Sequence, residues 1–361
     1  MDNIIIYRQR YLPASETFIY EQLLHFRKYR PLVYYTHLLE DAERFPYPEL
    51  APLPDLDSAV ERIRENRVRL IYARFGTAGV KLLPLKRAAG VPMITSFHGF
   101  DVTKEVKKNR RYAGKLPKLF RIGERFTVVC EHMKSKLIGL GCPADKIAVV
   151  KSGIDLDKFP FLPKTSADAA KIRLLSIGRL TEKKGMHVLI EAFSQVAKTY
   201  PEAKLVIIGD GDEKPRLEAL IRSLRLSGQV ELKGKRSHRD VRAELEACDL
   251  FCLASLTPAD GNEEGIPNAI IEASAIGRVV VSTRHAGIPE LIEHGANGYL
   301  VRENDADELA AALLHAVKQQ HNWRELVHRG RSKVEKEHEI RAQVGKVERL
   351  MSELLDAAGS S

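Results

Sequence analysis

Two glutamates, Glu264 and Glu272, stand eight positions apart in a segment that combines a Gly-rich loop with a helix start. Pro267 fits the first turn of that helix, where its missing N–H loses no hydrogen bond. The free N–H groups at a helix N-terminus can bind an anion. We expect Glu264, in the loop, to accept hydrogen bonds from sugar hydroxyls, and Glu272, one turn inside, from a ribose diol. Glycoside hydrolases also pair carboxylates, but usually from different elements that flank one bond, so a hydrolase is disfavoured.

A basic loop follows the strand predicted over residues 173–177 and precedes the helix predicted over residues 187–197. It carries Arg179 and Lys184 between two glycines. A guanidinium fork grips phosphate oxygens and an ammonium adds a point charge, so this pair suits a diphosphate. A solvated basic loop remains the alternative from these residues alone.

The sequence Gly-Asp-Gly-Asp-Glu at residues 209–213 ends another predicted strand. A lysine replaces the third glycine of a dinucleotide fingerprint. The Asp-x-Asp pattern could hold a divalent cation, but Asp210 and Asp212 fit a turn and a helix start better. Cys248 and Cys252 lack further ligands at zinc-like spacing and fit buried thiols. We therefore expect no metal site.

Polar residues also follow predicted strands in the first half. His98 and Gly99 come directly after the run 93–97, a better position for a site residue than that of an average histidine. Asp101 either joins this site or orders the loop. Three further candidates follow the first strand: Ser15, Glu16 and Thr17. Substrate contact and a structural role, such as a helix N-cap at Ser15, both remain open for them.

Positive charge is concentrated in the first half of the chain. The net charge is +9, and residues 1–163 contain 28 Lys and Arg against 18 Asp and Glu. The rest of the chain is close to neutral. This asymmetry suggests a polyanionic partner for the first half.

The densest basic segment is residues 104–136, and its cations alternate with apolar residues. The cations expected to form a surface patch are Lys107, Lys108, Arg110, Arg111, Lys115 and Lys118. The interleaved apolar residues are Val106, Tyr112, Leu116, Leu119 and Phe120. Such a mixture suits docking on anionic lipid headgroups, with an ordinary solvated surface as the alternative. No nucleic-acid-binding motif is present, so we expect no nucleic-acid partner.

Continuous apolar runs, such as residues 4–7 and 205–208, alternate with amphipathic stretches. This pattern favours parallel sheets covered on both faces by helices. Residues 161–168 lack apolar periodicity and indicate a linker. From residue 306 onward the pattern is helical.

These elements predict an α/β fold of two doubly wound, Rossmann-like domains that face a central cleft. The expected domains are residues 1–163 and 164–339, with a helix of about residues 340–361 packing back on the first domain. Ligands should then lie beyond the carboxyl ends of the strands.

The composition fits a soluble globular enzyme: of 361 residues, 44% are hydrophobic and 29% charged. No run approaches the roughly 18 apolar residues of a membrane span, and the N-terminus lacks a signal-peptide pattern. Four cysteines do not make a disulfide framework. We expect a cytoplasmic protein, with peripheral binding to the inner face of the plasma membrane as an open alternative.

As a set, these motifs resemble those of family 4 retaining glycosyltransferases, which have the GT-B fold. Glu264 and Glu272 fit the family's E-x7-E pattern, and His98-Gly99 resembles its His-Gly motif. Segments 178–185, 209–211 and 286–290 look like its other motifs, in the same order.

Two short sequences point to one branch of that family. Ser-Glu-Thr-Phe at residues 15–18 and Gly-Ile-Pro at residues 265–267 are similar to the exopolysaccharide branch, which includes the colanic acid glycosyltransferases. Many family members have a Gly-Gly loop after the first strand, and this chain does not.

The resemblance implies a role for most candidates. Arg179 and Lys184 would hold the donor diphosphate, Glu272 the ribose, and Glu264 and His98 the transferred sugar. The stretch around Lys233 would face the nucleotide base, largely through backbone atoms. The remaining donor contacts would come from Gly209, Gly265, Ile266 and Asn268.

We therefore expect retaining transfer of a hexose from a nucleotide-sugar to a hydroxyl of a glycan or lipid-linked acceptor, in cell-surface polysaccharide synthesis. Family frequency favours UDP over GDP. The second domain would hold the nucleotide and the first the acceptor. We expect no cofactor or metal, because Arg179, Lys184 and a helix N-terminus can stabilise the departing diphosphate. A sugar-nucleotide epimerase of the same architecture and a non-catalytic nucleotide-sugar-binding protein remain alternatives.

Overall fold

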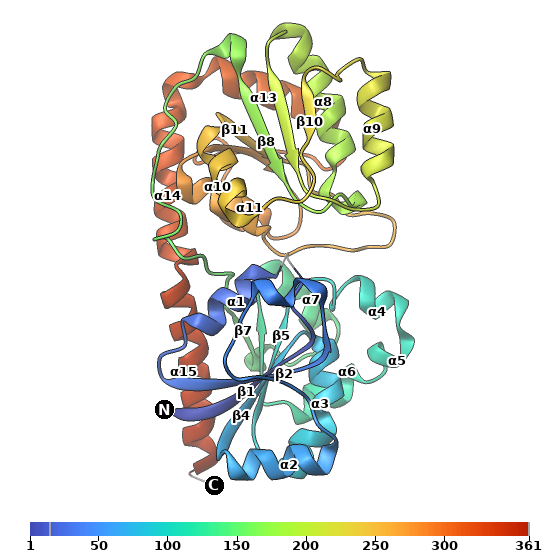
Figure 1. Ribbon diagram of the computed structural model, residues 1–361, viewed down its shortest axis with the longest axis vertical. Coiled ribbons are helices and arrows are strands. Elements are labelled where there is room, and N and C mark those ends of the chain that lie inside the picture. The colour runs from blue at the N-terminus through green and yellow to red at the C-terminus, as the bar shows by residue number, and fades with distance from the viewer. Residues whose placement is uncertain (14–15, 360–361) are drawn as a thin grey trace. The chain divides into compact units, whose positions relative to one another are not determined.

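The structure, a computed structural model, describes residues 1–13 and 16–359. It divides into two units (Figure 1): unit 1 is Met1–Ile154 with Glu339–Ser361, and unit 2 is Asp155–His338. Each unit is built on one β-sheet in which every strand pair is parallel. The predicted pair of Rossmann-like α/β domains is confirmed.

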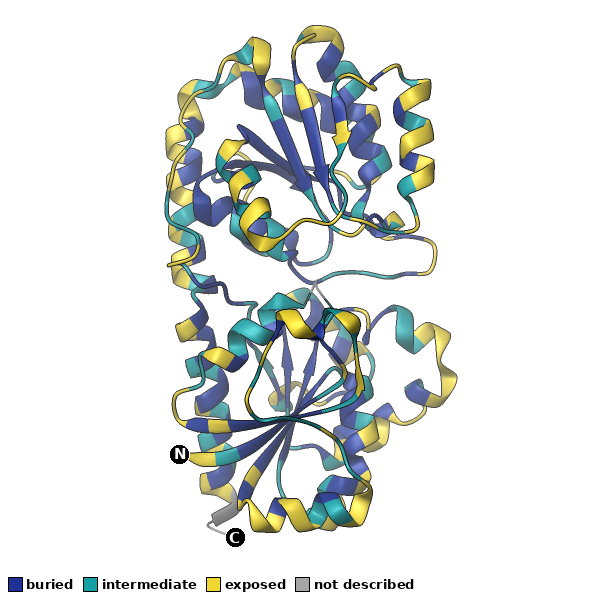
Figure 2. Cartoon of the chain, in the orientation of Figure 1, coloured by how far each residue is buried: buried dark blue, intermediate teal, exposed yellow. Residues whose placement is uncertain are grey.

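The sheet of unit 1 has the strand order β3-β2-β1-β4-β5-β6-β7. Its strands are β1 (Asp2–Tyr11), β2 (Tyr29–Leu38), β3 (Leu50–Pro52), β4 (Val68–Arg74), β5 (Met93–Phe97), β6 (Arg125–Val128) and β7 (Ile147–Val149). All five residues of β5 are buried, as expected for a strand covered on both faces. Figure 2 shows the same burial along most of the central strands.

The helices of unit 1 lie between these strands, except for the last one. They are α1 (Thr17–Leu24), α2 (Leu56–Glu65), α3 (Gly76–Ala89), α4 (Lys104–Lys108), α5 (Arg110–Ala113), α6 (Leu116–Ile122), α7 (Glu131–Gly139) and α15 (Ile340–Gly359). Helix α15 contributes Val347 and Met351 to the core of unit 1. The Glu348 carboxylate also accepts hydrogen bonds from the backbone N–H groups of Arg27 and Lys28, at 2.7 and 2.6 Å.

The sheet of unit 2 has the order β10-β9-β8-β11-β12-β13. Its strands are β8 (Arg173–Ile177), β9 (Lys204–Ile208), β10 (Val230–Leu232), β11 (Leu250–Leu253), β12 (Val279–Thr283) and β13 (Tyr299–Val301). Its helices are α8 (Met186–Thr199), α9 (Lys214–Ser223), α10 (His238–Ala247), α11 (Asn268–Ile276), α12 (Ile288–Leu291), α13 (Ala306–Lys318) and α14 (Trp323–His338).

The segment expected to be a linker is held by unit 2. The backbone N–H groups of Leu162 and Lys164 donate to the carbonyl oxygens of Ile276 and Gly277, each at 3.0 Å. The Arg278 guanidinium in turn donates to the Leu162 carbonyl at 2.7 Å. The boundary between the two units therefore lies between Ile154 and Asp155, earlier in the chain than the expected boundary at residue 163.

Candidate functional site

In unit 2, the loops that follow β8, β9 and β10 lie side by side. The Gly178 N–H donates to the Ile208 carbonyl at 3.0 Å, and the Gly209 N–H donates to the Gly234 carbonyl at 3.1 Å. Gly209 has a φ of +147°, and a Cβ there would lie 1.8 Å from the Gly178 carbonyl oxygen. Glycine is thus required at Gly209 for the loops to approach this closely.

Two lysines of the first of these loops bind Glu264. Lys184 Nζ lies 2.6 Å from Glu264 Oε2, and Lys183 Nζ lies 3.4 Å from Glu264 Oε1. All three side chains are between 10 and 12% exposed. The lysines end a 3₁₀ turn, Glu182–Lys184, immediately before α8. The structure thus brings together the two motifs that the sequence places eighty residues apart.

The lysines keep Glu264 ionised. Burial alone would raise the pKa of this carboxyl, but Lys184 and Lys183 outweigh that effect and lower the pKa to about 2. Glu264 is therefore an acceptor of hydrogen bonds at any physiological pH.

Glu272 has the opposite environment. It lies in the second turn of α11, and no ion pair or hydrogen bond holds its carboxylate within the described residues. Burial raises its pKa to about 7. A carboxylate in this state gains from any ligand that supplies hydroxyl donors.

His285 fixes the loop that carries Glu264. The imidazole is fully buried, and its Nδ1 lies 2.8 Å from Glu303 Oε1. The Glu264 backbone N–H donates to Nε2 at 3.3 Å, which requires the ring proton to be on Nδ1. The Gly287 N–H also donates to the Gly265 carbonyl at 3.2 Å. The segment 286–290 therefore adjoins the loop before α11.

The other donor candidates of unit 2 lie on the same loops. The Arg179 side chain is exposed. The Lys233 ammonium lies 2.5 Å from the Glu244 carboxylate of α10, and its backbone N–H donates to the Ile207 carbonyl at 2.9 Å. Gly265 and Ile266 are buried beside the start of α11, and Asn268 is its first residue.

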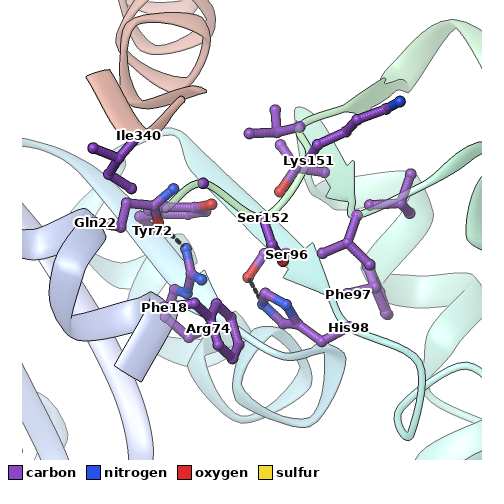
Figure 3. A pocket seen from close by; sticks show the side chains of 15 residues that line it. Phe18, Gln22, Tyr72, Arg74, Ser96, Phe97, His98, Lys151, Ser152 and Ile340 are labelled. Carbon is purple, nitrogen blue, oxygen red and sulfur yellow. Dashed lines mark hydrogen bonds between the residues drawn. The ribbon is translucent and has the colours of Figure 1, made fainter. Parts of the chain in front are cut away.

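In unit 1, His98 follows β5 and lies between two aromatic rings. Its ring centroid is 5.2 Å from that of Phe18 and 4.6 Å from that of Phe75. Nε2 is 2.9 Å from Ser96 Oγ, and Nδ1 is buried with no hydrogen-bond partner among the described residues (Figure 3). Burial, helped by Arg74, lowers the pKa of His98 well below its usual value. The ring is therefore neutral at physiological pH.

Asp101 holds the backbone of the His98 loop. Its carboxylate is fully buried and accepts from the N–H groups of Gly76, His98 and Gly99, at 2.8, 2.9 and 3.2 Å. Burial raises its pKa to about 6, although these hydrogen bonds oppose the shift. Of the two roles considered for Asp101, the geometry supports ordering of the loop.

Glu16 is neutralised by Arg8. The Arg8 guanidinium donates to both carboxylate oxygens, at 2.7 and 2.6 Å, and lies 4.1 Å from the centroid of the Phe75 ring. Thr17 begins α1. Ser15 lies outside the described residues.

The basic segment exposes its cations but not its apolar residues. All six cations of the expected patch are exposed along α4 to α6. Four of the five apolar residues, however, are buried in the core of unit 1: Tyr112, Leu116, Leu119 and Phe120. The expected mixed apolar and basic surface is wrong, because these side chains recur at helical spacing and face inward. The patch is a charged surface.

Comparisons with known proteins agree with these motifs. A family model described as Glycosyl transferases group 1 matches residues 158–333, and one described as Glycosyltransferase Family 4 matches residues 25–158. The WcaL protein of Escherichia coli strain K12, assigned to colanic acid biosynthesis as a glycosyltransferase, is 39% identical over 81% of this chain and 71% of its own length. The chain belongs to glycosyltransferase family 4.

A second relative is also assigned to exopolysaccharide biosynthesis. The amylovoran biosynthesis glycosyltransferase AmsK of Erwinia amylovora is 40% identical over 74% of this chain and 66% of its own length. The chain thus spans about two thirds of these relatives. The predicted resemblance to exopolysaccharide glycosyltransferases is confirmed.

Solved structures identify the fold. HepE of Anabaena in complex with UDP-glucose has a TM-score of 0.82 and 20% identity, over 98% of this chain and all of that chain. At this identity the likeness shows the fold alone. The predicted GT-B fold is confirmed.

The described residues contain no group of three or more His, Cys, Asp or Glu side chains that could hold a metal ion. Asp210 accepts from the Gly211 N–H at 2.9 Å, as a turn residue does. Cys248 and Cys252 are fully buried free thiols, as expected. No described helix combines the length and apolar character that crossing a membrane requires.

Three site residues of this family 4 protein were missed from the sequence. Lys183 stands in a run of charges that resembles any solvated loop. His285 directly precedes the segment 286–290, and that position was its only signal. Arg74 ends β4 immediately after an apolar run, and only the structure shows its guanidinium to be buried.

Proposed function

We propose that this protein is a retaining, metal-independent hexosyltransferase that uses a nucleotide-sugar, with a UDP-sugar favoured and a GDP-sugar as the alternative. The acceptor is a hydroxyl of a glycan or a lipid-linked sugar in cell-surface polysaccharide synthesis. Its family 4 relatives WcaL and AmsK and the UDP-glucose complex of HepE support this proposal.

The observation that carries the proposal is the Lys183–Lys184–Glu264 cluster of unit 2. A departing diphosphate gains negative charge in the transition state, and fixed cations in a partly dry site stabilise that charge. Lys184, with Arg179 on the same loop, supplies such cations without a metal ion. Glu264, ionised beside them, can accept hydrogen bonds from the hydroxyls of the transferred sugar.

Unit 2 holds the nucleotide in this proposal. Glu272 binds the ribose diol, and the backbone of residues 233–235 lies against the base. His98 of unit 1, kept neutral by burial, offers a hydrogen bond to the transferred sugar rather than a proton. Unit 1 also binds the acceptor.

The test is donor turnover with a panel of UDP- and GDP-sugars and membrane-extracted acceptors, with and without EDTA. Proton NMR of the anomeric centre reports whether the configuration is retained. Lys184→Ala should lower kcat/KM by about 10²-fold or more, as loss of one stabilising donor does elsewhere. Lys198→Ala, an exposed lysine of α8, is the matched control. An inverted product or activity lost in EDTA would contradict the proposed mechanism, and donor conversion without acceptor would indicate an epimerase.

We also propose that the exposed cations of α4 to α6 bring unit 1 to an anionic membrane surface. Each Lys or Arg near such a surface contributes about 1 kcal/mol, without insertion of apolar side chains. Sedimentation with phosphatidylglycerol vesicles should be lost on reversing Lys107, Lys108 and Arg111 to Glu. Reversing the exposed Arg62, Arg64 and Arg69 of the same unit is the control. Equal binding by both triple variants would contradict this surface role.

A further inference from the structure

Unit 1 contains a small cavity at the carboxyl ends of β4, β5 and β6 (Figure 3). Its volume is about 20 Å³. A water-sized group needs roughly 10–15 Å³ measured in this way, so the space admits the tip of a ligand and not a sugar ring. The polar side chains around it come from several elements: Gln22, Tyr72, Arg74, Ser96, His98, Thr127, Lys151 and Ser152.

Arg74 lines this cavity with a buried guanidinium that forms no ion pair with a carboxylate of the described residues. The residue is 2% exposed. One guanidinium nitrogen donates to Gln22 Oε1, and the guanidinium carbon lies 4.8 Å from the Tyr72 ring centroid. Its Nε is buried and has no hydrogen-bond partner among the described residues. Glu16 carries the charge that could neutralise it, but Arg8 occupies both oxygens of that carboxylate.

A buried charge without a counter-ion is costly, and a perturbed group of this kind marks a candidate ligand site. The buried guanidinium of Arg278 is satisfied by backbone carbonyls, whereas that of Arg74 keeps Nε unpaired among the described residues. The guanidinium stays protonated even when burial lowers its pKa. Arg74 therefore offers a positive charge and an unused donor to whatever enters the cavity.

The other walls favour the same kind of ligand. None of the residues that line the cavity is acidic. One hydrogen bond joins Ser96 Oγ to His98 Nε2, and the buried Nδ1 has no partner among the described residues. Because the ring is neutral, either the Ser96 hydroxyl or the His98 Nδ1–H, but not both, can donate to a ligand. Lys151 also lines the cavity, but its ammonium group points away from Arg74 and Ser96 (Figure 3), so the positive charge at the cavity is that of Arg74. Donors and positive charge without carboxylates match an oxyanion.

We propose that this cavity binds an oxyanion, a carboxylate or a phosphate, carried by the acceptor. The inference rests on the proposed function and narrows it: the acceptor is anionic, and Arg74 recognises its charged group. A guanidinium fork suits carboxylate and phosphate equally. The oxyanion therefore belongs either to an acidic sugar or to a lipid-linked diphosphate.

Calorimetry with three probes tests the inference: glucuronate for an acidic sugar, farnesyl diphosphate for a lipid-linked diphosphate, and neutral glucose. Saturating UDP occupies the diphosphate site proposed for unit 2. We expect at least one anion to bind and glucose not to. Arg74→Gln should weaken anion binding at least about tenfold, the usual range for a lost hydrogen bond to a charged group. Arg69→Gln, an exposed arginine on the same strand β4, should leave it unchanged.

Failure of this inference is distinguishable from failure of the proposed function. UDP affinity measured on the same variants reports on unit 2 alone, whereas the difference between Arg74→Gln and Arg69→Gln reports on the cavity. Absence of binding by both anions, or equal affinities in the two variants, overturns the oxyanion site.

If Arg74→Gln does not fold, NMR spectra of the wild-type protein test the oxyanion site instead. The His98 ring resonances, assigned by comparison with His98→Gln, should shift in NMR spectra when the anion is added. An anion that binds without moving them occupies another site and overturns the inference.

Discussion

The pKa of Glu272 predicts how nucleotide binding depends on pH. Burial raises this pKa to about 7 in the ligand-free protein. Only the ionised carboxylate accepts hydrogen bonds from both hydroxyls of a ribose diol, so the protonated form should bind poorly. Ionisation falls from about nine tenths at pH 8 to about one tenth at pH 6, which predicts a roughly tenfold weaker apparent affinity at pH 6.

Titration calorimetry with UDP and GDP at both pH values measures this effect. The terminal phosphate of the nucleotide itself titrates near pH 6, so part of any slope belongs to the ligand. Glu272→Gln keeps the shape of the side chain and removes its titration. The tenfold loss of affinity between pH 8 and pH 6 that comes from Glu272 should therefore disappear in Glu272→Gln. It should persist in Glu218→Gln, a variant at an exposed position of α9.

Proton release gives an independent reading of the same linkage. At pH 7 the wild type should release about half a proton per bound nucleotide from this carboxyl, because binding selects the ionised form. Titrations in two buffers of different ionisation enthalpy measure that number. The role of Glu272 is refuted if the nucleotide affinities of wild type and Glu272→Gln depend equally on pH and both proteins release the same number of protons on binding.

Further predictions concern stability, followed by the fluorescence of Trp323, the single tryptophan, which is buried in unit 2. Glu272→Gln should stabilise the ligand-free protein above pH 7 by on the order of 2 kcal/mol, because folding favours the protonated form of the Glu272 carboxyl. This gain in stability should vanish as the pH falls towards 4.5, the ordinary pKa of a glutamate. A gain that does not depend on pH would contradict this cause. Gly185→Ala should cost at least about 2 kcal/mol of stability, because a Cβ there lies 1.8 Å from a backbone carbonyl oxygen. Gly234→Ala, at a similar φ but with open space around it, should cost about 1 kcal/mol. Equal urea midpoints for the two variants would argue against the clash. His285→Ala should cost about 1–3 kcal/mol, because it leaves the Glu264 N–H without its acceptor and removes one hydrogen bond from Glu303, which keeps those from Thr257. An unchanged urea midpoint would show that the Glu264 N–H finds another partner.

The fold could be predicted because its signals are local. Continuous apolar runs become central strands, and Gly-rich segments after them become the loops at the carboxyl ends. All four edge strands have three residues, and two of them, β7 and β10, were predicted from short apolar runs. The other two, β3 (Leu50–Pro52) and β13 (Tyr299–Val301), were not predicted. Three residues are too few to show a period, so such strands are defined largely by pairing with a neighbour.

The surface of the basic segment was predicted wrongly because its composition was considered and its helical spacing was not. Leu116, Leu119 and Phe120 recur at positions i, i+3 and i+4, the spacing of one face of α6, and Tyr112 lies on the preceding helix, α5. That face covers the core, and the cations between its members point outward. The composition suggested a surface of mixed apolar and basic residues, whereas the helical periodicity would have separated the buried apolar residues from the exposed cations.

Arg74 was missed because polarity alone places an arginine outside. Nothing in the sequence indicates that its guanidinium lies beside Gln22 and Tyr72, because Gln22 belongs to α1, a separate element from β4, which carries Tyr72 and Arg74. A buried arginine becomes visible only when the neighbours that desolvate it are assembled.

The two glutamates of the E-x7-E pattern show why residue type does not fix residue chemistry. Both belong to one loop and its helix, yet the pKa of Glu264 is lowered to about 2 and that of Glu272 is raised to about 7. The difference comes from Lys183 and Lys184, which a separate loop brings to Glu264 and not to Glu272. Glu264 is consequently a permanent anion among cations, whereas Glu272 exchanges its proton near neutrality. Of these two carboxyls, only Glu272 should make nucleotide binding depend on pH, and the calorimetric comparison of wild type with Glu272→Gln measures its share.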